Sequence, residues 1–156
     1  MRLTLLLLLP IAALGFAPAP VFREKPNDPE SVLKCLQGDW AMPRYEQNGR
    51  TRISNGEAYM VKIEKDLWTF YHSHNGGPLT KSMSYTLKLD PKATPAEIDF
   101  LDYLSTPTYR LLGVYELKGD TLRIAFRTNT GANMDRVRSL ATPAPNDYVI
   151  ELQRKP

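Results

Sequence analysis

Two histidines, His72 and His74 in "YHSHNGG", have the spacing that comes closest to a metal or catalytic site. Two positions apart on a predicted strand, their imidazoles point to the same face and could bind one metal ion. They are the only histidines in the chain, however, and a zinc site needs further ligands. The sole cysteine, Cys35, lies far away in the sequence, in a predicted helix. We therefore predict no metal site and no cofactor, and interpret both histidines as polar residues at the end of a hairpin.

Other residue patterns that could support catalysis also have simpler explanations. Ser73 lies between the two histidines, but its side chain points to the opposite strand face, so neither imidazole can take its proton. Glu97 and Asp99 share a strand face and could form an acid–base pair, although solvated carboxylates opposite an apolar Ile98–Phe100 face are the favoured interpretation. The sequence contains no nucleophile elbow, phosphate loop or dinucleotide fingerprint. We predict no catalytic residue and a protein that is not an enzyme.

The N-terminus has the order of a secretory signal peptide. Arg2 is followed by an apolar run from Leu3 to Phe16 and then by small residues. The run is shorter than the roughly 20 residues of a membrane-spanning helix. We predict a signal peptide at residues 1–17, a proline-rich tether at 18–29 and one domain at 30–156. The protein is then exported, periplasmic or secreted, and meets a membrane only during export.

After the predicted tether, the sequence predicts a short helix followed by strands. Asp28 is a suitable N-cap before Pro29, and Gly38 ends the predicted helix. After Gly38 the apolar residues alternate with a period of two, which predicts about eight strands joined mostly by short loops. This pattern is typical of an all-β antiparallel barrel or sandwich. The net charge of +3 is small, so we predict no nucleic-acid partner.

The clearest hairpin is "YRLLGVYELKGDTLRIAF", with a predicted turn at Lys118–Gly119. This register places Gly113 opposite Ile124, where the glycine would leave room beside the isoleucine. It also places Arg110 opposite Arg127, and two like charges in direct opposition are unfavourable. We therefore predict a carboxylate or a bound anion near both arginines. A carboxylate from a neighbouring strand is the favoured choice.

Five segments resemble, in the same order, an uncharacterised exported domain family that is expanded in planctomycete bacteria. They are "LQGDW", "NGR", "KLDPKATPAEIDF", "GVYELKGDTLRIAF" and "DRVRSL", within residues 32–154. The family is thought to be lipocalin-like, so the resemblance implies a lipocalin-like barrel of about eight strands with a short N-terminal helix. Gly38-x-Trp40 is similar to the first lipocalin motif, in which the tryptophan closes one barrel end. By the same resemblance Arg154 is expected to stack on Trp40. The resemblance implies no established activity.

The predicted function is a non-enzymatic exported domain that binds a small apolar or amphipathic ligand in its barrel. An eight-stranded barrel is just wide enough to hold one small ligand or to be filled by its own side chains. The residues predicted to line the ligand cavity are Trp40, Tyr85, Gly113, Tyr115 and Phe126. The alternative is a filled barrel that acts as an envelope or protein–protein interaction module. This alternative rests on a predicted outward-facing apolar patch of Leu112, Val114 and Ala125, because exposed apolar patches often mark contacts with other proteins. It loses this support if the predicted helix covers the patch.

Overall fold

The computed structural model describes residues 27–53, 56–102, 109–130, 135–141, 144 and 146–156. The predicted signal peptide and most of the predicted tether lie outside this part of the chain. Within the described residues no helix has both the length and the apolar character of a membrane span. The elements are α1 (Pro29–Leu36), β1 (Gly38–Gln47), β2 (Arg50–Thr51), β3 (Ala58–Glu64), β4 (Leu67–Ser73), β5 (Thr80–Asp90), β6 (Glu97–Asp102), β7 (Tyr109–Lys118), β8 (Thr121–Thr130) and β9 (Asp147–Arg154).

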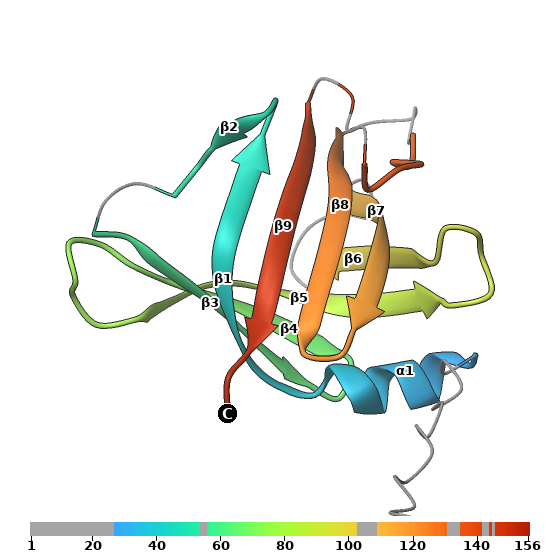
Figure 1. Cartoon of the computed structure of the whole chain (residues 1–156), viewed down its shortest axis with the longest axis horizontal. Coiled ribbons are helices and arrows are strands. Elements are labelled where there is room, and N and C mark those ends of the chain that lie inside the picture. Colours follow the sequence, from blue (N-terminus) through green and yellow to red (C-terminus); the bar gives the residue numbers. More distant parts are fainter. Residues whose placement is uncertain (1–26, 54–55, 103–108, 131–134, 142–143, 145) are drawn as a thin grey trace, which may run out of the picture.

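The strands form a closed antiparallel barrel (Figure 1). Strands β3 to β9 pair in sequence order, β1 pairs with β3, and β1 also pairs with β9, which closes the barrel. The two-residue β2 pairs only with the end of β1, so eight strands make up the barrel. This confirms the predicted all-β barrel with a short N-terminal helix. The sandwich that the alternation also allowed is not formed.

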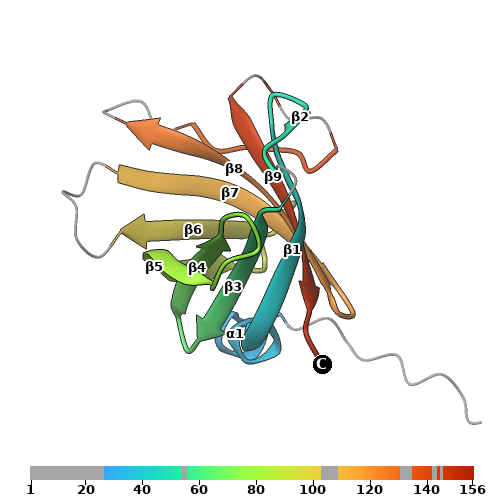
Figure 2. The same cartoon turned by 90° about the vertical axis from the view of Figure 1, so that its left-hand side faces the viewer.

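Helix α1 lies at the end of the barrel where β1 begins and β9 ends (Figures 1 and 2). Its first turn is capped by Asp28, whose carboxylate accepts a hydrogen bond from the Ser31 backbone N–H at 2.9 Å. Val32 and Leu36 lie on one face of the helix and are buried in the barrel core. The helix therefore contributes apolar side chains to this end of the core.

The core is filled with aliphatic side chains at the α1 end. Alternation along each strand turns every second residue inward. Ile63, Leu122, Ile124 and Leu152 are fully buried there and belong to one apolar cluster with Trp40 and Leu36. Burial of apolar area of this kind is the main source of stability in a chain without a disulfide.

The register of the β7–β8 hairpin differs from the prediction. Lys118 pairs with Thr121, so the turn is Gly119–Asp120, and Gly119 takes a positive φ of 56° that glycine adopts readily. Tyr115 consequently lies opposite Ile124 rather than Leu122. The partner of each residue shifts by two positions, and because the side-chain period is also two, the inward and outward faces stay as predicted.

This register also changes the expected role of Gly113. The residue lies opposite Phe126, and a Cβ added to it would come within 2.5 Å of the Ala125 carbonyl oxygen and 2.9 Å of Phe126 Cβ. Gly113 therefore does not make room beside Ile124, as predicted. It is glycine because β8 approaches the β7 backbone too closely for any side chain.

The two arginines predicted to face one another are apart in register. Arg110 lies opposite Asn129, and Arg127 lies opposite Leu112. The Arg127 Nε atom donates to Oδ1 of Asp147 on the neighbouring β9 at 2.7 Å, and Asp147 is buried. For Arg127, a carboxylate from the adjacent strand is therefore the partner, as favoured from the sequence. For Arg110 the predicted opposition was wrong.

Candidate functional site

A cavity of about 170 Å³ lies inside the barrel, at the end away from α1. Its position follows from the strands that line it: β1 contributes Met42 and Tyr45 from beyond its start, and β9 contributes Tyr148 and Ile150 from before its end. Met83 also lines it and is 45% exposed, so the cavity reaches the surface near this residue. The cavity is thus a pocket with one closed end inside the barrel.

Seven aromatic side chains form most of the cavity wall, and we call them the aromatic cup. They are Tyr45, Trp68, Phe70, Tyr85, Phe100, Phe126 and Tyr148. The remaining lining residues are Met42, Met83, Leu111, Thr128 and Ile150. The cup is therefore predominantly apolar, with hydroxyl groups and the Trp68 indole N–H as its polar groups.

The rings of the aromatic cup hold one another in place. Phe126 and Tyr148 stack with their centroids 5.2 Å apart and an interplanar angle of 9°, and Tyr45 continues this row at 6.0 Å from Tyr148. Phe100 meets Trp68 edge to face at 5.1 Å. Such ring pairs stabilise each other by roughly 0.5–1.5 kcal/mol beyond the burial of their area. The wall is thus built from mutually supporting rings.

None of the residues that line this described cavity carries a carboxylate, ammonium, guanidinium or imidazole group. Polar atoms come from Thr128, from the tyrosines and from the indole N–H of Trp68. The Tyr85 hydroxyl lies 2.9 Å from Met83 Sδ. A charged group placed here would lose its hydration without gaining an ionic partner in the wall. The chemistry of the cup therefore suits an uncharged molecule.

Two of the five residues predicted to line a ligand cavity lie in the cup, namely Tyr85 and Phe126. Trp40, Gly113 and Tyr115 are not among its lining residues. Tyr115 is only 3% exposed and fills the barrel interior, where burial, with the charge of Asp90 as a smaller cause, raises its pKa to about 12.

Tyr45 and Tyr148 were not predicted from the sequence. The signal for Tyr45 is hidden by a bulge in β1, where the pairing with β9 shifts between Ala41 and Arg44. Met42 and Tyr45, three positions apart, consequently both line the cavity, and simple alternation would have selected Arg44 instead. Pro43, which has no N–H to donate, lies within this irregular stretch and is the available clue. Tyr148 has no such irregularity, because it alternates with Ile150 along the regular strand β9.

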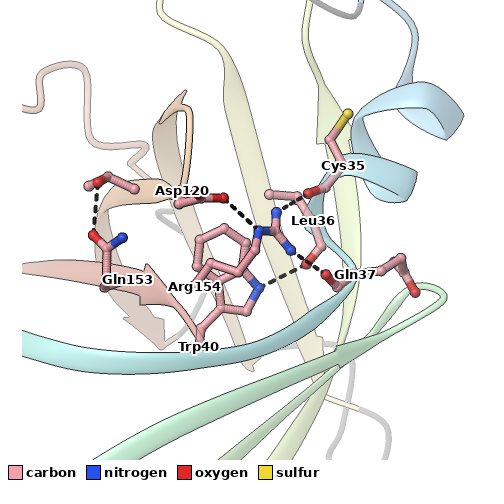
Figure 3. A network of polar contacts seen from close by, with 8 residues as sticks. Cys35, Leu36, Gln37, Trp40, Asp120, Gln153 and Arg154 are labelled. Carbon is pink, nitrogen blue, oxygen red and sulfur yellow. Dashed lines mark hydrogen bonds and ion pairs between the residues drawn. The ribbon is translucent and has the colours of Figure 1, made fainter. Parts of the chain in front are cut away.

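The opposite barrel end contains the residues predicted to close it, Gly38, Trp40 and Arg154. Trp40 is fully buried, and its indole Nε1 donates to the Leu36 carbonyl oxygen at 2.9 Å (Figure 3). The Arg154 guanidinium carbon lies 4.2 Å from the Trp40 ring centroid. Gly38 has a φ of +116°, and a Cβ there would be 3.5 Å from Arg154 Nη1. All three residues therefore lie together beside the C-terminus of α1.

Arg154 also connects three segments of the chain at this end. Its Nη1 donates to the Gln37 carbonyl at 2.5 Å, its Nη2 donates to the Cys35 carbonyl, and its Nε donates to the Asp120 carboxylate at 3.2 Å (Figure 3). The last carbonyls of a helix have no partner within the helix, so these bonds satisfy groups that would otherwise lack one. We call Trp40, Arg154 and these bonds the α1 clamp.

The two histidines are not part of a metal-binding cluster among the described residues. Their ring centroids are 4.7 Å apart, and His74 Nδ1 lies 3.3 Å from Oε1 of Glu57. Within the part of the chain that the structure describes, no three His, Cys, Asp or Glu side chains gather around a common point. The Ser73 hydroxyl donates a hydrogen bond to the Gly77 carbonyl oxygen at 2.8 Å, so it stabilises the loop that follows β4.

The Glu97 and Asp99 pair binds an arginine on the outside of the barrel. Arg136 lies with Nε 3.1 Å from Glu97 Oε2 and with Nη1 2.6 Å from Asp99 Oδ1, and it also donates to the Gly113 carbonyl. Asp99 in particular is mostly buried beneath this arginine rather than solvated. The pair therefore anchors the segment 135–141 to β6 and β7.

This anchored segment covers part of the predicted outward patch. Val114 and Ala125 are at most 1% exposed and form a second apolar cluster with Val137 and Val149, against which Leu140 packs. The covering segment is 135–141, not α1 as considered from the sequence. Val114 and Ala125 are consequently not part of an exposed docking surface.

Comparisons with protein-family models, with curated proteins and with solved structures find no match to this chain. The resemblance described from the sequence therefore stays a prediction.

Proposed function

We propose that the chain is an exported, lipocalin-like binding protein whose barrel holds a small apolar or amphipathic molecule. The observation that carries the proposal is the cavity of about 170 Å³, bounded mainly by aromatic side chains. An apolar concave pocket with a few hydroxyl groups is the usual form of a small-molecule site. Export is supported by the apolar leader after Arg2.

The two barrel ends support binding rather than a filled barrel. At the α1 end large apolar residues such as Ile63 and Leu152 leave no exposed surface, and Arg154 covers Trp40. At the other end space remains among the rings of the cup. A ligand would therefore enter near Met83 and stop at the filled half of the core.

The chemistry of the cup favours binding over catalysis. Its described lining offers thioether, hydrocarbon, indole and hydroxyl groups, and none of these is an acid or base near neutral pH. The interaction module considered from the sequence is not favoured, because Val114 and Ala125 are covered by the chain itself.

The test begins with the full chain expressed with its own leader and purified from the extracytoplasmic fraction. Native and denaturing mass spectra are then compared before and after incubation with indole and with 1-octanol. We expect a mass excess that disappears on denaturation. The absence of any added mass, both as purified and with either probe at millimolar concentration, would overturn the proposal.

A substitution at the cavity mouth links the binding to the cup. Met83→Trp adds an indole to a residue that lines the cavity and is 45% exposed, so the new ring has room without repacking the core. Leu67→Trp is the matched control, because Leu67 is 37% exposed and does not line the cavity. We expect binding to fall in the first variant and to remain in the second.

A further inference from the structure

The size and the wall of the cup limit which small molecule it can take. We infer that the ligand is an uncharged planar aromatic molecule of one ring or two fused rings, bound among the rings of the aromatic cup. This inference rests on the proposed function and specifies its ligand class.

The first argument is volume. The cavity of about 170 Å³ is close to the roughly 150 Å³ at which a dry apolar protein cavity takes up benzene. A single ring with one small substituent fits such a space, and a bicyclic molecule fits if one edge extends toward Met83 at the mouth. Long acyl chains, sterols and tetrapyrroles exceed it.

The second argument is the chemistry of the wall. Seven of the twelve lining residues are aromatic and only Leu111 and Ile150 are aliphatic, whereas the filled half of the same barrel is mostly aliphatic. Ring pairs prefer offset stacking or edge-to-face contact. Both geometries already occur in the cup: Phe126 stacks on Tyr148, and Phe100 meets Trp68 edge to face. Met42 and Met83 add polarisable sulfur atoms, which also make favourable contacts with rings. A flat aromatic ligand gains these interactions, and a saturated ligand of the same size does not.

The third argument is charge. The described lining has no ionic partner for a carboxylate or an amine. Glu57 Oε1 and His74 Nδ1 lie 3.3 Å apart at this end of the barrel, and neither residue lines the cavity. The ion pairs Arg44–Glu46 and Arg127–Asp147 also lie outside the lining. A single hydroxyl or ring N–H, by contrast, can bond to Thr128 or a tyrosine hydroxyl.

The experiment compares probes that differ in one property each. Phenol and cyclohexanol share their size and single hydroxyl but differ in aromaticity, and benzyl alcohol and benzoate differ in charge at pH 7. Dissociation constants are measured by NMR titration of the full chain. We expect phenol to bind about threefold to tenfold more tightly than cyclohexanol, and benzoate to bind at least tenfold more weakly than benzyl alcohol.

Phe70→Leu tests the origin of the preference. Phe70 lines the cavity and is only half-buried, so leucine keeps an apolar wall while one ring is lost. The phenol-to-cyclohexanol ratio should fall toward one while cyclohexanol still binds, and the thermal unfolding midpoint confirms that the variant is folded.

The outcomes separate this inference from the proposed function. If cyclohexanol binds as well as phenol and Met83→Trp blocks both, the cup binds ligands without aromatic preference, and only the inference fails. If benzoate binds as well as benzyl alcohol, the uncharged class is wrong. If no probe binds the wild-type chain, both proposals fail.

Discussion

The two ends of the barrel use the same strands in different ways. At the α1 end the inward residues are mainly aliphatic, and Trp40, Leu36 and Val32 complete a filled core. At the other end the inward residues are mainly aromatic, and a cavity of about 170 Å³ remains between them. The rings at this end pair with one another, and the cavity lies among them.

By this comparison the α1 end is the stabilising half of the molecule, and the cup is the half that we propose binds a ligand. Substitutions in the first half should lower the free energy of unfolding, and substitutions at the cup mouth should change ligand affinity with little effect on stability.

Trp40→Ala should have the largest effect on stability. It removes a fully buried indole, its hydrogen bond to Leu36 and its contact with Arg154. Truncation of a buried tryptophan costs about 3–5 kcal/mol of unfolding free energy. Urea unfolding followed by circular dichroism measures the loss. Leu67→Ala, at an exposed position, is the control and should change stability by less than about 1 kcal/mol.

Arg154→Ala should lower stability by about 1–2 kcal/mol, because hydrogen bonds to a charged group are lost and the side chain is partly exposed. Arg154→Lys keeps the charge but not the planar fork that reaches the carbonyls of Cys35 and Gln37 together. Lysine should recover less than half of the loss in the same urea experiment. Full recovery would show that charge alone, without the α1 clamp geometry, is sufficient.

Tyr115 should make stability fall at high pH. Its pKa is about 12 in the folded chain and about 10 in an unfolded one, so the folded state keeps the proton longer. The stabilisation is complete below pH 10 and is lost as the pH rises toward 12. Between pH 8 and pH 11 the wild type should lose about 1 kcal/mol more than Tyr115→Phe. Equal losses in both proteins would contradict a buried, neutral Tyr115.

Met83→Trp should have the smallest effect on stability. Because Met83 is 45% exposed at the cavity mouth, the free energy of unfolding should stay within about 0.5 kcal/mol of the wild type. Phenol affinity should nevertheless fall more than tenfold, as measured by NMR titration. A large loss of stability without a loss of affinity would reverse the assignment of the two ends.

Much of the barrel follows from the period-two pattern, because each strand has one apolar and one polar face. That pattern correctly places Tyr85 and Phe126 on the inside. The contact between Arg154 and Trp40, expected from the lipocalin resemblance, is present in the structure. These features need only local alternation or a short motif.

Other features depend on geometry that alternation does not encode. The β7–β8 turn lies one residue later than predicted because Gly119 supplies the positive φ at the first turn position. Tyr45 enters the cup only because β1 is bulged. The segment 135–141 shows neither the strand nor the helix period, so the sequence could not predict that its Val137 packs against Val114. Pocket and covering segment are therefore tertiary properties.

Methionine methyl groups offer the most direct test of the central claim that ligands bind in the cup. Met42 and Met83 line the cavity, whereas Met60 lies near Lys155 and does not. With ¹³C-methyl-labelled methionine, a phenol titration should shift the NMR signals of Met42 and Met83 and leave that of Met60 unchanged. Signals of Met42 and Met83 that stay unmoved at saturating phenol would contradict the account.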